Sequence, residues 1–542
     1  MHGLIMDHPL LVADIVRHVE RFHSDTEVVS RLPDAGGAIH RSTYGEVAAR
    51  SRRVADLLDT LGVASQATVG TLAWNTYRHL ELYYGVSGAR RVLHTVNPRL
   101  FPEQIVWIIN HAEDQVIFFD VTFASLIDGI ASQCPQVKHW VALTTAERLP
   151  AMQQIKPLAY ESLLAAASDR YDWPSFDERE AASLCYTSGT TGNPKGVLYS
   201  HRSTILHAMA ASMPDVMCLS ARDVVLPVVP MFHVNAWGTP YSCGMMGAKL
   251  VLPGAGLDGA SLYELFESEK VTFSAGVPTV WLGLLQHLQK NNLKFSTIWR
   301  STVGGSACPP ALMKTFRDDY GVRIGHAWGM SEMSPLGTYG TLKNHHLALP
   351  PDEQFAVQIK QGRPIFGVDI KIVDDAGQEL PRDGKAFGDI QVKGPWVVSG
   401  YYKLTTDPTV DGWFPTGDVG TLDPDGFLQI TDRSKDVIKS GGEWISSIDL
   451  ENVAMAHPAV QEAAVIGVPH PKWDERPLLV VVSKPGHSPS REEVLAHFTG
   501  KIAKWWTPDD VVFVSEIPHT ATGKISKLQL RQQFKQHQLP TA

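Results

Sequence analysis

The stretch AKLVLPGAGLDGASLYELFESEKVTFSAGVP, residues 248–278, contains a strand, a helix and a second strand in succession. The apolar runs at 248–253 and 271–278 have the length and composition of buried strands, whereas residues 261–270 between them have helical character. Strands that alternate with helices in this way form parallel sheets covered by helices. The segment therefore predicts an α/β fold.

The same stretch contains GAGLDG, Gly254 to Gly259, which satisfies the GxGxxG pattern of dinucleotide-binding loops. A dinucleotide site also needs an acidic residue after the following strand, about 20 residues further on. That strand ends in Ala275, Gly276 and Val277. The pattern fails this second test, which argues against a dehydrogenase.

Beyond this stretch, the alternation of strand-like and helix-like segments continues over much of the first 340 residues, with further apolar runs at 116–120 and 224–230. From Gly362 the pattern changes to short alternating strands with tight turns, as in 368–380 and 388–402. Such a pattern predicts a small, mostly antiparallel β subdomain.

A polar stretch, TDRSKD at 431–436, precedes a final unit with a helix at 447–456 and strands at 463–468 and 477–482. A chain of 542 residues exceeds the size at which one hydrophobic core keeps growing. Domain boundaries fall in exposed polar segments of this kind. We therefore predict an N-terminal domain at 1–431, a hinge at 432–437 and a small α+β C-terminal domain at 438–542.

Composition and charge narrow the class of protein. With 48 basic and 57 acidic residues the net charge is −9, and no dense basic stripe offers a surface for nucleic acid. The five cysteines are odd in number and form no CxxC pair, which predicts reduced thiols in a cytoplasmic protein. Residues 1–22 predict an amphipathic helix and not a targeting peptide. No apolar run reaches the roughly 18 residues of a membrane span.

The string YTSGTTGNPKGV, Tyr186 to Val197, combines glycines, hydroxyl side chains and one lysine. Glycines let the backbone approach an anion closely, and hydroxyl groups donate hydrogen bonds to phosphate oxygens. It is not a Walker A loop, because Lys195 is preceded by Pro194 and followed by Gly196. The string predicts a polyphosphate-binding loop, and a plain Ser/Thr/Gly surface loop is the alternative.

This string resembles the phosphate-loop signature of the adenylate-forming, or AMP-binding, superfamily, which contains acyl-CoA synthetases, luciferases and peptide-synthetase adenylation domains. Other segments are similar to the family's remaining motifs and follow its order: GGSACP at 304–309, HAWGMSE at 326–332, GWFPTGD at 412–418, DRSKDVIKSGGEWIS at 432–446 and PHTATGK at 518–524. The resemblance implies an N-terminal domain of two parallel-sheet αβα subdomains and a β subdomain, followed by a mobile C-terminal domain.

The resemblance implies a role for each matched residue. Trp328 would stack on adenine, and Asp418 would accept hydrogen bonds from the ribose diol with Arg433 assisting. Glu332, with Thr190, would hold Mg²⁺. Ser331 replaces the family's usual Thr and keeps its hydroxyl, and His326 stands where an amide often meets the adenine amino group. The implied ATP and AMP site consists of Thr187, Ser188, Gly189, Thr190, Thr191, Lys195, Gly305, Ser306, Ala307, His326, Trp328, Gly329, Ser331, Asp418 and Arg433.

The acid-binding side is carried by PMFHVNAWG, residues 230–238. His233 and Trp237 resemble the aromatic residues beside the acyl pocket of the fatty-acyl branch, in which the tryptophan gates entry. The implied pocket consists of His233, Trp237, Val303, Gly304, Gly329, Met330 and Pro335. Because no charged group for an amino acid is present, the pocket favours aliphatic acids. The motifs are most similar to those of short- and medium-chain fatty-acyl-CoA synthetases and methylmercaptopropionate-CoA ligases.

The resemblance implies two reaction steps with ATP, a carboxylate and CoA as substrates. The implied catalytic residues are Lys524, His233 and Glu332, with Lys524 bridging the carboxylate and the α-phosphate as charge builds. The C-terminal domain would then rotate about the hinge residues Asp432, Lys435 and Asp436. This rotation would present the CoA-channel residues Lys439, Gly441, Gly442, Glu443 and Trp444.

Three alternatives remain within this interpretation. The enzyme could act on long-chain fatty acids, or it could transfer the acyl group to a different acceptor such as a carrier protein. It could also be an inactive relative that binds nucleotide for regulation, although the charged motif residues are intact. Members of the family are often homodimers, and we expect the same here.

Overall fold

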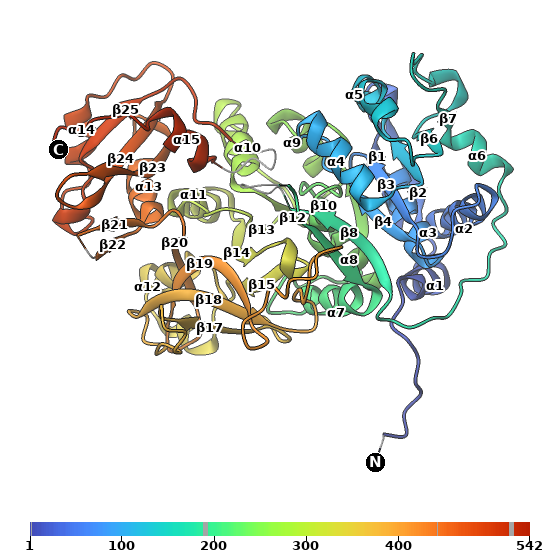
Figure 1. The fold of residues 1–542 in the computed structure, drawn as a ribbon, viewed down its shortest axis with the longest axis horizontal. Coiled ribbons are helices and arrows are strands. Elements are labelled where there is room, and N and C mark those ends of the chain that lie inside the picture. Colours follow the sequence, from blue (N-terminus) through green and yellow to red (C-terminus); the bar gives the residue numbers. More distant parts are fainter. Residues whose placement is uncertain (2, 188–192, 442, 520–524, 542) are drawn as a thin grey trace.

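The computed structural model of the chain describes residues 1, 3–187, 193–441, 443–519 and 525–541. Two large sheets with their helices occupy the right and centre of Figure 1, and a smaller sheet and the C-terminal domain lie at the left. This arrangement confirms the predicted α/β fold with parallel sheets and a small C-terminal domain.

The larger sheet has nine strands in the order β16-β15-β14-β13-β12-β10-β11-β1-β2. Neighbouring strands from β1 through β11, β10, β12 and β13 to β14 pair in parallel, and the strands at both edges pair antiparallel. The bounds in this spatial order are Arg363–Pro364, Leu336–Tyr339, Arg323–Gly329, Arg300–Val303, Phe273–Gly276, Val224–Pro227, Lys249–Leu252, Glu27–Arg31 and Ile39–Thr43.

The second large sheet has seven strands in the order β7-β6-β5-β3-β4-β8-β9. All neighbours pair in parallel except β8 and β9, which form an antiparallel pair on either side of the predicted phosphate loop. The bounds in this order are Leu158–Ala159, His139–Ala142, Val116–Phe119, Thr68–Leu72, Val92–Thr95, Ala181–Tyr186 and Gly196–Ser200.

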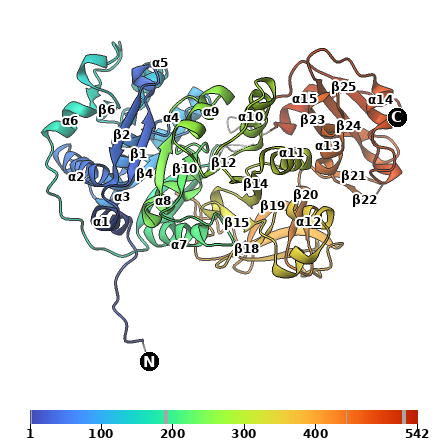
Figure 2. The ribbon, with the colours of Figure 1, turned by 180° about the vertical axis from the view of Figure 1, so that it is seen from behind.

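Helices cover both sheets, and one of them lies inside the core. All residues of α3 (Tyr77–Gly88) are buried, and α3 packs against α1 (Val12–Phe22) and α2 (Tyr44–Thr60). The buried face of α1 agrees with the amphipathic helix that the sequence predicts. Figure 2 shows the same layers from behind. The other helices of the first 360 residues are α4 Pro102–Ala112, α5 Ala124–Ile130, α6 Tyr160–Ala166, α7 His201–Ser212, α8 Thr239–Met246, α9 Gly259–Ser268, α10 Pro278–Lys290, α11 Pro310–Tyr320 and α12 Pro351–Gln358.

The GAGLDG segment leads into the N-terminus of helix α9. Asp258 caps α9, because its carboxylate accepts the backbone N–H groups of Ala260 and Ser261. The helix N-terminus that would bind a pyrophosphate is therefore occupied by the protein's own carboxylate, in agreement with the exclusion of a dinucleotide site.

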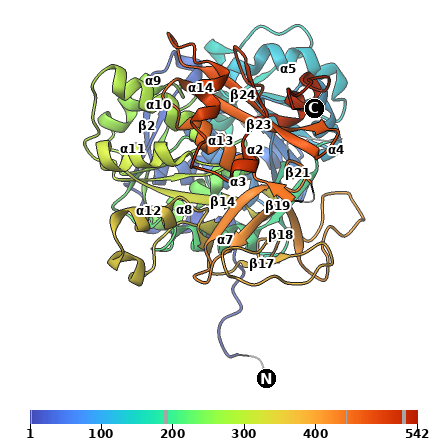
Figure 3. The ribbon, with the colours of Figure 1, turned by 90° about the vertical axis from the view of Figure 1, so that its left-hand side faces the viewer.

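The region from residue 369 to 433 forms the predicted antiparallel sheet, with β17 Asp369–Val373, β18 Phe387–Lys393, β19 Phe414–Leu422 and β20 Leu428–Arg433. Above it lies the C-terminal domain (Figure 3), built on a five-stranded sheet. Its elements are β21 Ile438–Ser440, β22 Glu443–Ile445, α13 Ser447–Met455, β23 Val460–His470, β24 Asp474–Ser483, α14 Arg491–Ala496, β25 Asp510–Phe513 and α15 Lys527–Gln533. The predicted hinge begins inside β20 and ends just before β21.

Candidate active site

A cavity of about 600 Å³ opens where the two large sheets, the four-stranded sheet and the C-terminal domain meet. Several lining segments follow the carboxyl ends of β12, β13 and β14, which is where α/β sheets bind ligands. The cavity brings together these residues predicted from the sequence: Thr187, Lys195, His233, Trp237, Gly304, Gly305, Ser306, Ala307, His326, Trp328, Gly329, Met330, Ser331, Glu332, Pro335, Asp418, Asp432, Arg433, Lys435 and Asp436.

Some predicted residues do not line this cavity or cannot be placed. Val303 is buried within β13, and neither Lys439 nor Gly441 reaches the cavity. Ser188, Gly189, Thr190, Thr191, Gly442 and Lys524 lie outside the described residues, as do the side chains of Glu443 and Trp444. The structure thus joins the predicted nucleotide, acid and hinge residues, and leaves the described part of the predicted CoA channel elsewhere.

Asp418 organises one end of the cavity. Its Oδ2 accepts the indole N–H of Trp328 at 2.8 Å, and its Oδ1 lies 2.8 Å from Arg433 Nε. Asp418 and Arg433 are directly paired across β19 and β20, so the sheet register fixes this contact. A carboxylate can accept about four hydrogen bonds, which leaves capacity for a ligand diol. Gly337 packs on the Trp328 ring, where a Cβ atom would come within 3.1 Å.

His326 is buried beside the cavity, and both of its ring nitrogens are engaged by backbone. Nδ1 donates to the carbonyl of Ile359 at 2.9 Å, and Nε2 accepts the N–H of Cys308 at 3.4 Å. Burial lowers the pKa of His326 to about 4, so the ring is neutral at physiological pH. The ring therefore offers the cavity its carbon edge, and no free nitrogen remains for a nucleotide base.

The phosphate-loop ends and Glu332 form the polar wall. The N–H of Thr187 donates to the carbonyl of Lys195 at 2.9 Å, which ties the two ends of the loop together. Glu332 is 8% exposed, and its Oε1 accepts the hydroxyl of Tyr401 at 2.9 Å. No described lysine or arginine forms an ion pair with this carboxylate. A buried carboxylate without a cationic partner fits a divalent cation, so the residues present are consistent with Mg²⁺.

The acid side is built on a left-handed turn, Val234–Gly238. Val234, Asn235, Ala236 and Trp237 have φ between 46° and 56°, a region that non-glycine residues rarely adopt. The turn brings His233 and Trp237 to the cavity wall, and the Trp237 indole lies against Gly304 and Gly305. Backbone strain of this kind persists where surrounding contacts fix it, commonly at functional sites.

The side chain of Asn235, a residue of this turn, anchors the turn to the neighbouring strand β8. Its Nδ2 donates to Ser183 Oγ at 2.9 Å, and its Oδ1 lies 3.3 Å from both Cys185 Sγ and the Tyr83 hydroxyl. Ser183 and Cys185 belong to β8, the strand that leads into the phosphate loop. Sequence reasoning missed both Asn235 and Tyr401; the only local signal was their position inside or beside recognisable motifs.

The hinge region contacts the C-terminal domain through a few polar groups. Asp432 is buried and accepts the N–H of Ser447 at 2.9 Å, and Ser446 Oγ donates to the carbonyl of Thr431 at 2.6 Å. Asp436 pairs with Arg531 of α15. Lys435 lines the cavity, and burial lowers its pKa.

His345, His346 and Asp425 form a second cluster of metal-ligand side chains, away from the cavity. The backbone N–H of Lys343 donates to His346 Nδ1 at 3.1 Å, so Nε2 carries the proton of the neutral ring and donates to Asp425. Lys343 Nζ also lies 3.0 Å from Asp425. Because a metal ligand needs a free lone pair at Nε2, this cluster is a hydrogen-bonded bridge between loops.

Sequence and structure comparisons give consistent results. Residues 15–402 match the family described as AMP-binding enzyme, and residues 449–524 match the AMP-binding enzyme C-terminal domain.

In the part of the chain that the structure describes, no helix has the length and the apolar character that spanning a membrane requires.

The relatives match over nearly their whole length. The chain is 55% identical over 537 residues to 3-methylmercaptopropionyl-CoA ligase of Ruegeria lacuscaerulensis, covering 99% of both chains. It is 51% identical over 535 residues to the medium-chain fatty-acid–CoA ligase of Ectopseudomonas oleovorans, covering 98% of both. Among solved structures, an anthranilate CoA ligase in complex with anthranoyl-AMP has 25% identity, a TM-score of 0.87 and 98% coverage of both chains.

Proposed function

The chain belongs to the AMP-binding enzyme family, and on that premise we propose that it is an AMP-forming acyl-CoA ligase for a short- or medium-chain aliphatic acid or 3-methylmercaptopropionate. The observation that carries this proposal is the single cavity that collects the predicted nucleotide and acid residues. Relatives named for these two kinds of acid match almost the full chain.

In the first step the acid's carboxylate attacks the α-phosphorus of ATP, pyrophosphate leaves and an acyl-adenylate remains. Asp418 and Arg433 hold the ribose, and Lys195 and Ser331 contact the phosphates. Glu332, with Thr190, would hold Mg²⁺, which neutralises phosphate charge when bound. His233 lies at the acid side of the cavity, and Lys524 stabilises the charge that develops as the carboxylate attacks.

In the second step the thiol of CoA attacks the adenylate carbonyl and AMP leaves. We propose that the C-terminal domain rotates about Asp432 to Asp436 between the steps. Lys439 and Gly441 lie outside the cavity in this orientation, which supports the need for such a motion. After the rotation, the loop from Lys439 to Trp444 would line the thiol channel.

Part of the cavity wall beside His233 and Trp237 is apolar. Met217, Pro278 and Leu282 line the cavity together with Trp237. A thioether sulfur and a methylene are similar in size and polarity, so one pocket suits both classes of acid.

We also propose a homodimer in the cytoplasm. The N-terminal tail projects from the body of the protein (Figure 1), and Leu4, Ile5 and Met6 on it are almost fully exposed. An apolar tail of this kind favours association with a second copy. The five cysteines are all unpaired, as expected in a reducing compartment.

The reaction is tested by acid-dependent exchange of labelled pyrophosphate into ATP, using acids of two to twelve carbons and 3-methylmercaptopropionate. We expect exchange with a short- or medium-chain acid or the thioether acid, and loss of exchange in Lys524→Ala. Absence of exchange across the panel would overturn the proposal and favour a regulatory nucleotide-binding protein. A maximum at long-chain acids would contradict the proposed substrate class.

CoA as the acceptor is tested separately. If acid consumption does not depend on CoA, the enzyme activates its acid for a different acceptor. Product analysis by mass spectrometry distinguishes an acyl-CoA from a released adenylate.

A further inference from the structure

We propose that Tyr401 is a positioning residue that keeps Lys195 and Glu332 apart and separately oriented for phosphate and metal. This inference rests on the proposed function, since it concerns how the same site binds MgATP. Tyr401 lies in the loop between β18 and β19, far in sequence from both charged residues. Its side chain lines the cavity.

The backbone on both sides of Tyr401 is tied to the two groups that its side chain contacts. The N–H of Val398 donates to the carbonyl of Glu332 at 2.8 Å, and the N–H of Tyr402 donates to the carbonyl of Gly196 at 2.8 Å. Gly196 directly follows Lys195 in the chain. Segment 398–402 therefore links the end of the phosphate loop to Glu332, and the Tyr401 side chain contacts both Lys195 and Glu332.

The two ends of the tyrosine ring make different contacts. Its hydroxyl donates to Glu332 Oε1 at 2.9 Å, and the ammonium of Lys195 lies 4.7 Å from the ring centroid. The second distance is typical of a cation–π contact. Burial and the neighbouring Glu332 raise the pKa of the Tyr401 phenol well above its usual value, so it remains a hydrogen-bond donor.

These contacts give Lys195 and Glu332 separate partners, so that neither is committed to a salt bridge with the other. Lys195 is exposed and Glu332 is buried, and because both border the same cavity their opposite charges attract each other. Yet neither Lys195 nor Glu332 forms an ion pair with another described residue. The Tyr401 side chain offers each of them a partner of its own, the ring face to Lys195 and the hydroxyl to Glu332. Both charges thus stay available for a nucleotide that brings its own phosphates and metal.

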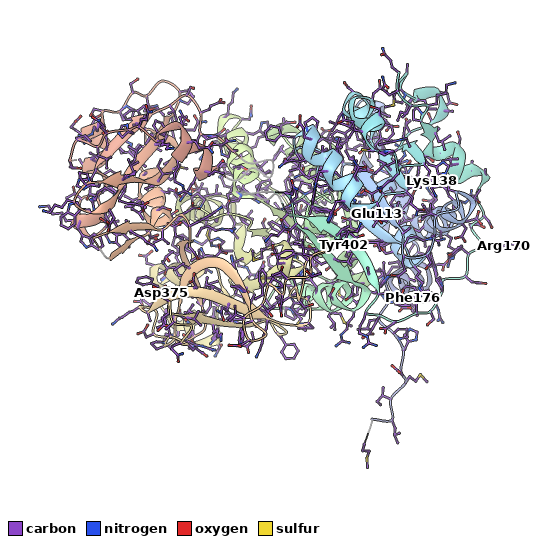
Figure 4. The ribbon with its side chains drawn as sticks, in the orientation of Figure 1. Glu113, Lys138, Arg170, Phe176, Asp375 and Tyr402 are labelled. Carbon is purple, nitrogen blue, oxygen red and sulfur yellow. The ribbon has the colours of Figure 1, made fainter. Side chains whose placement is uncertain are left out.

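Three substitutions separate these roles. Tyr401→Phe keeps the ring and removes the hydroxyl, whereas Tyr401→Leu removes both the hydrogen bond and the cation–π face. Tyr402→Phe is the matched control, because it removes a hydroxyl from the next residue. The Tyr402 ring packs against His111 of α4, beside Glu113 at the end of that helix (Figure 4), and does not line the cavity.

The measurement is calorimetric binding of ATP to the full-length protein, once in EDTA and once in saturating Mg²⁺, with the melting temperature recorded for each variant. We expect Tyr401→Phe to bind metal-free ATP like the wild type and to lose about 5- to 10-fold of the gain that Mg²⁺ provides. Tyr401→Leu should in addition bind metal-free ATP about 3-fold more weakly. Tyr402→Phe should match the wild type.

The inference is overturned if Tyr401→Phe keeps the full gain from Mg²⁺, or if Tyr402→Phe loses as much of it. A uniform loss of melting temperature and of both affinities would also overturn it, because that pattern indicates a merely structural role. Failure of the proposed function is distinguishable: wild-type protein that binds MgATP but catalyses no exchange contradicts the reaction alone. Wild-type protein that binds no ATP contradicts both.

Discussion

Asp418 joins the two strands of a sheet to the ring of Trp328, and it is 4% exposed. Replacing it with alanine would leave a buried indole N–H without an acceptor and Arg433 without its partner. We expect Asp418→Ala to lower the free energy of unfolding by about 2–3 kcal/mol and Asp418→Asn to lower it by less, because asparagine keeps one acceptor oxygen. Denaturant titration measures both.

A ligand analogue tests the binding role of the same residue. If Asp418 accepts the ribose hydroxyls, wild-type enzyme should prefer ATP over 2′-deoxy-ATP, and Asp418→Asn should lose most of that preference. An undiminished preference in the variant would place the ribose elsewhere. The comparison of the two nucleotides within one variant cancels its effect on stability.

Single residues differ in how well the sequence predicted them. The cavity contains Trp328, Asp418 and Arg433, which were named from motif resemblance alone. The engaged nitrogens of His326 could not be predicted, because its partner Ile359 lies far away in the chain. The contact of Tyr401 with Glu332 was equally hidden, since it joins different subdomains.

The left-handed turn at Val234–Gly238 requires positive φ angles of its residues, and this requirement should affect the stability of variants. A glycine in a helix or strand usually makes a protein less stable than an alanine does. At Asn235, where φ is +51°, we expect glycine to be the more stabilising of the two. We expect Asn235→Gly to be more stable than Asn235→Ala by about 1 kcal/mol, with both below the wild type because the bond to Ser183 is lost. Chemical denaturation of the two variants measures this difference.

The two variants also serve as each other's control, since both remove the same side-chain amide. Equal stabilities, or a more stable alanine variant, would show that backbone strain does not govern this turn. Catalytically, we expect the KM for the acid to rise in both, because the turn carries His233 and Trp237.

The helices and strands agree with the sequence-based prediction where the apolar pattern reflects burial of the element. The apolar runs at 248–253 and 271–278 correspond to β11 and β12, and residues 261–270 overlap α9. The turn at 234–238 was not predicted, because valine, alanine and tryptophan carry no preference for positive φ. Its conformation is imposed by tertiary contacts such as the bond from Asn235 to Ser183.

The stability of the whole molecule should depend on pH through buried neutral histidines. Burial lowers the pKa of His207 to about 3, and its Nε2 accepts the N–H of Leu336. Unfolded histidine titrates near 6.5. Between pH 6.5 and 3 the unfolded chain therefore binds the additional proton, and stability falls as the pH falls.

The variant His207→Gln isolates this contribution. We expect the stability difference between wild type and variant to shrink by about 2 kcal/mol from pH 7 to pH 5, at about 1.4 kcal/mol per pH unit below 6.5. Urea titrations at the two pH values measure it, and a difference that is independent of pH would contradict it.

Asp120 acts in the opposite direction: burial raises its pKa to about 7, so its contribution to stability grows as the pH falls.

At the scale of the molecule, the sequence predicted the class of fold and the presence of a small C-terminal domain. It could not predict how that domain sits, because individual polar groups make the contacts at the hinge. Asp432 and Thr431 contact Ser447 and Ser446 through individual hydrogen bonds, and no apolar pattern in the sequence marks such contacts.

This sparse attachment at the hinge has a consequence for timing. Two hydrogen bonds at about 0.5–1.5 kcal/mol each and the Asp436–Arg531 pair at up to about 1 kcal/mol can be outweighed by a ligand that prefers another arrangement by roughly a thousandfold. If the C-terminal domain rotates as proposed, the ligand in the cavity determines how long the enzyme stays in each of its two arrangements.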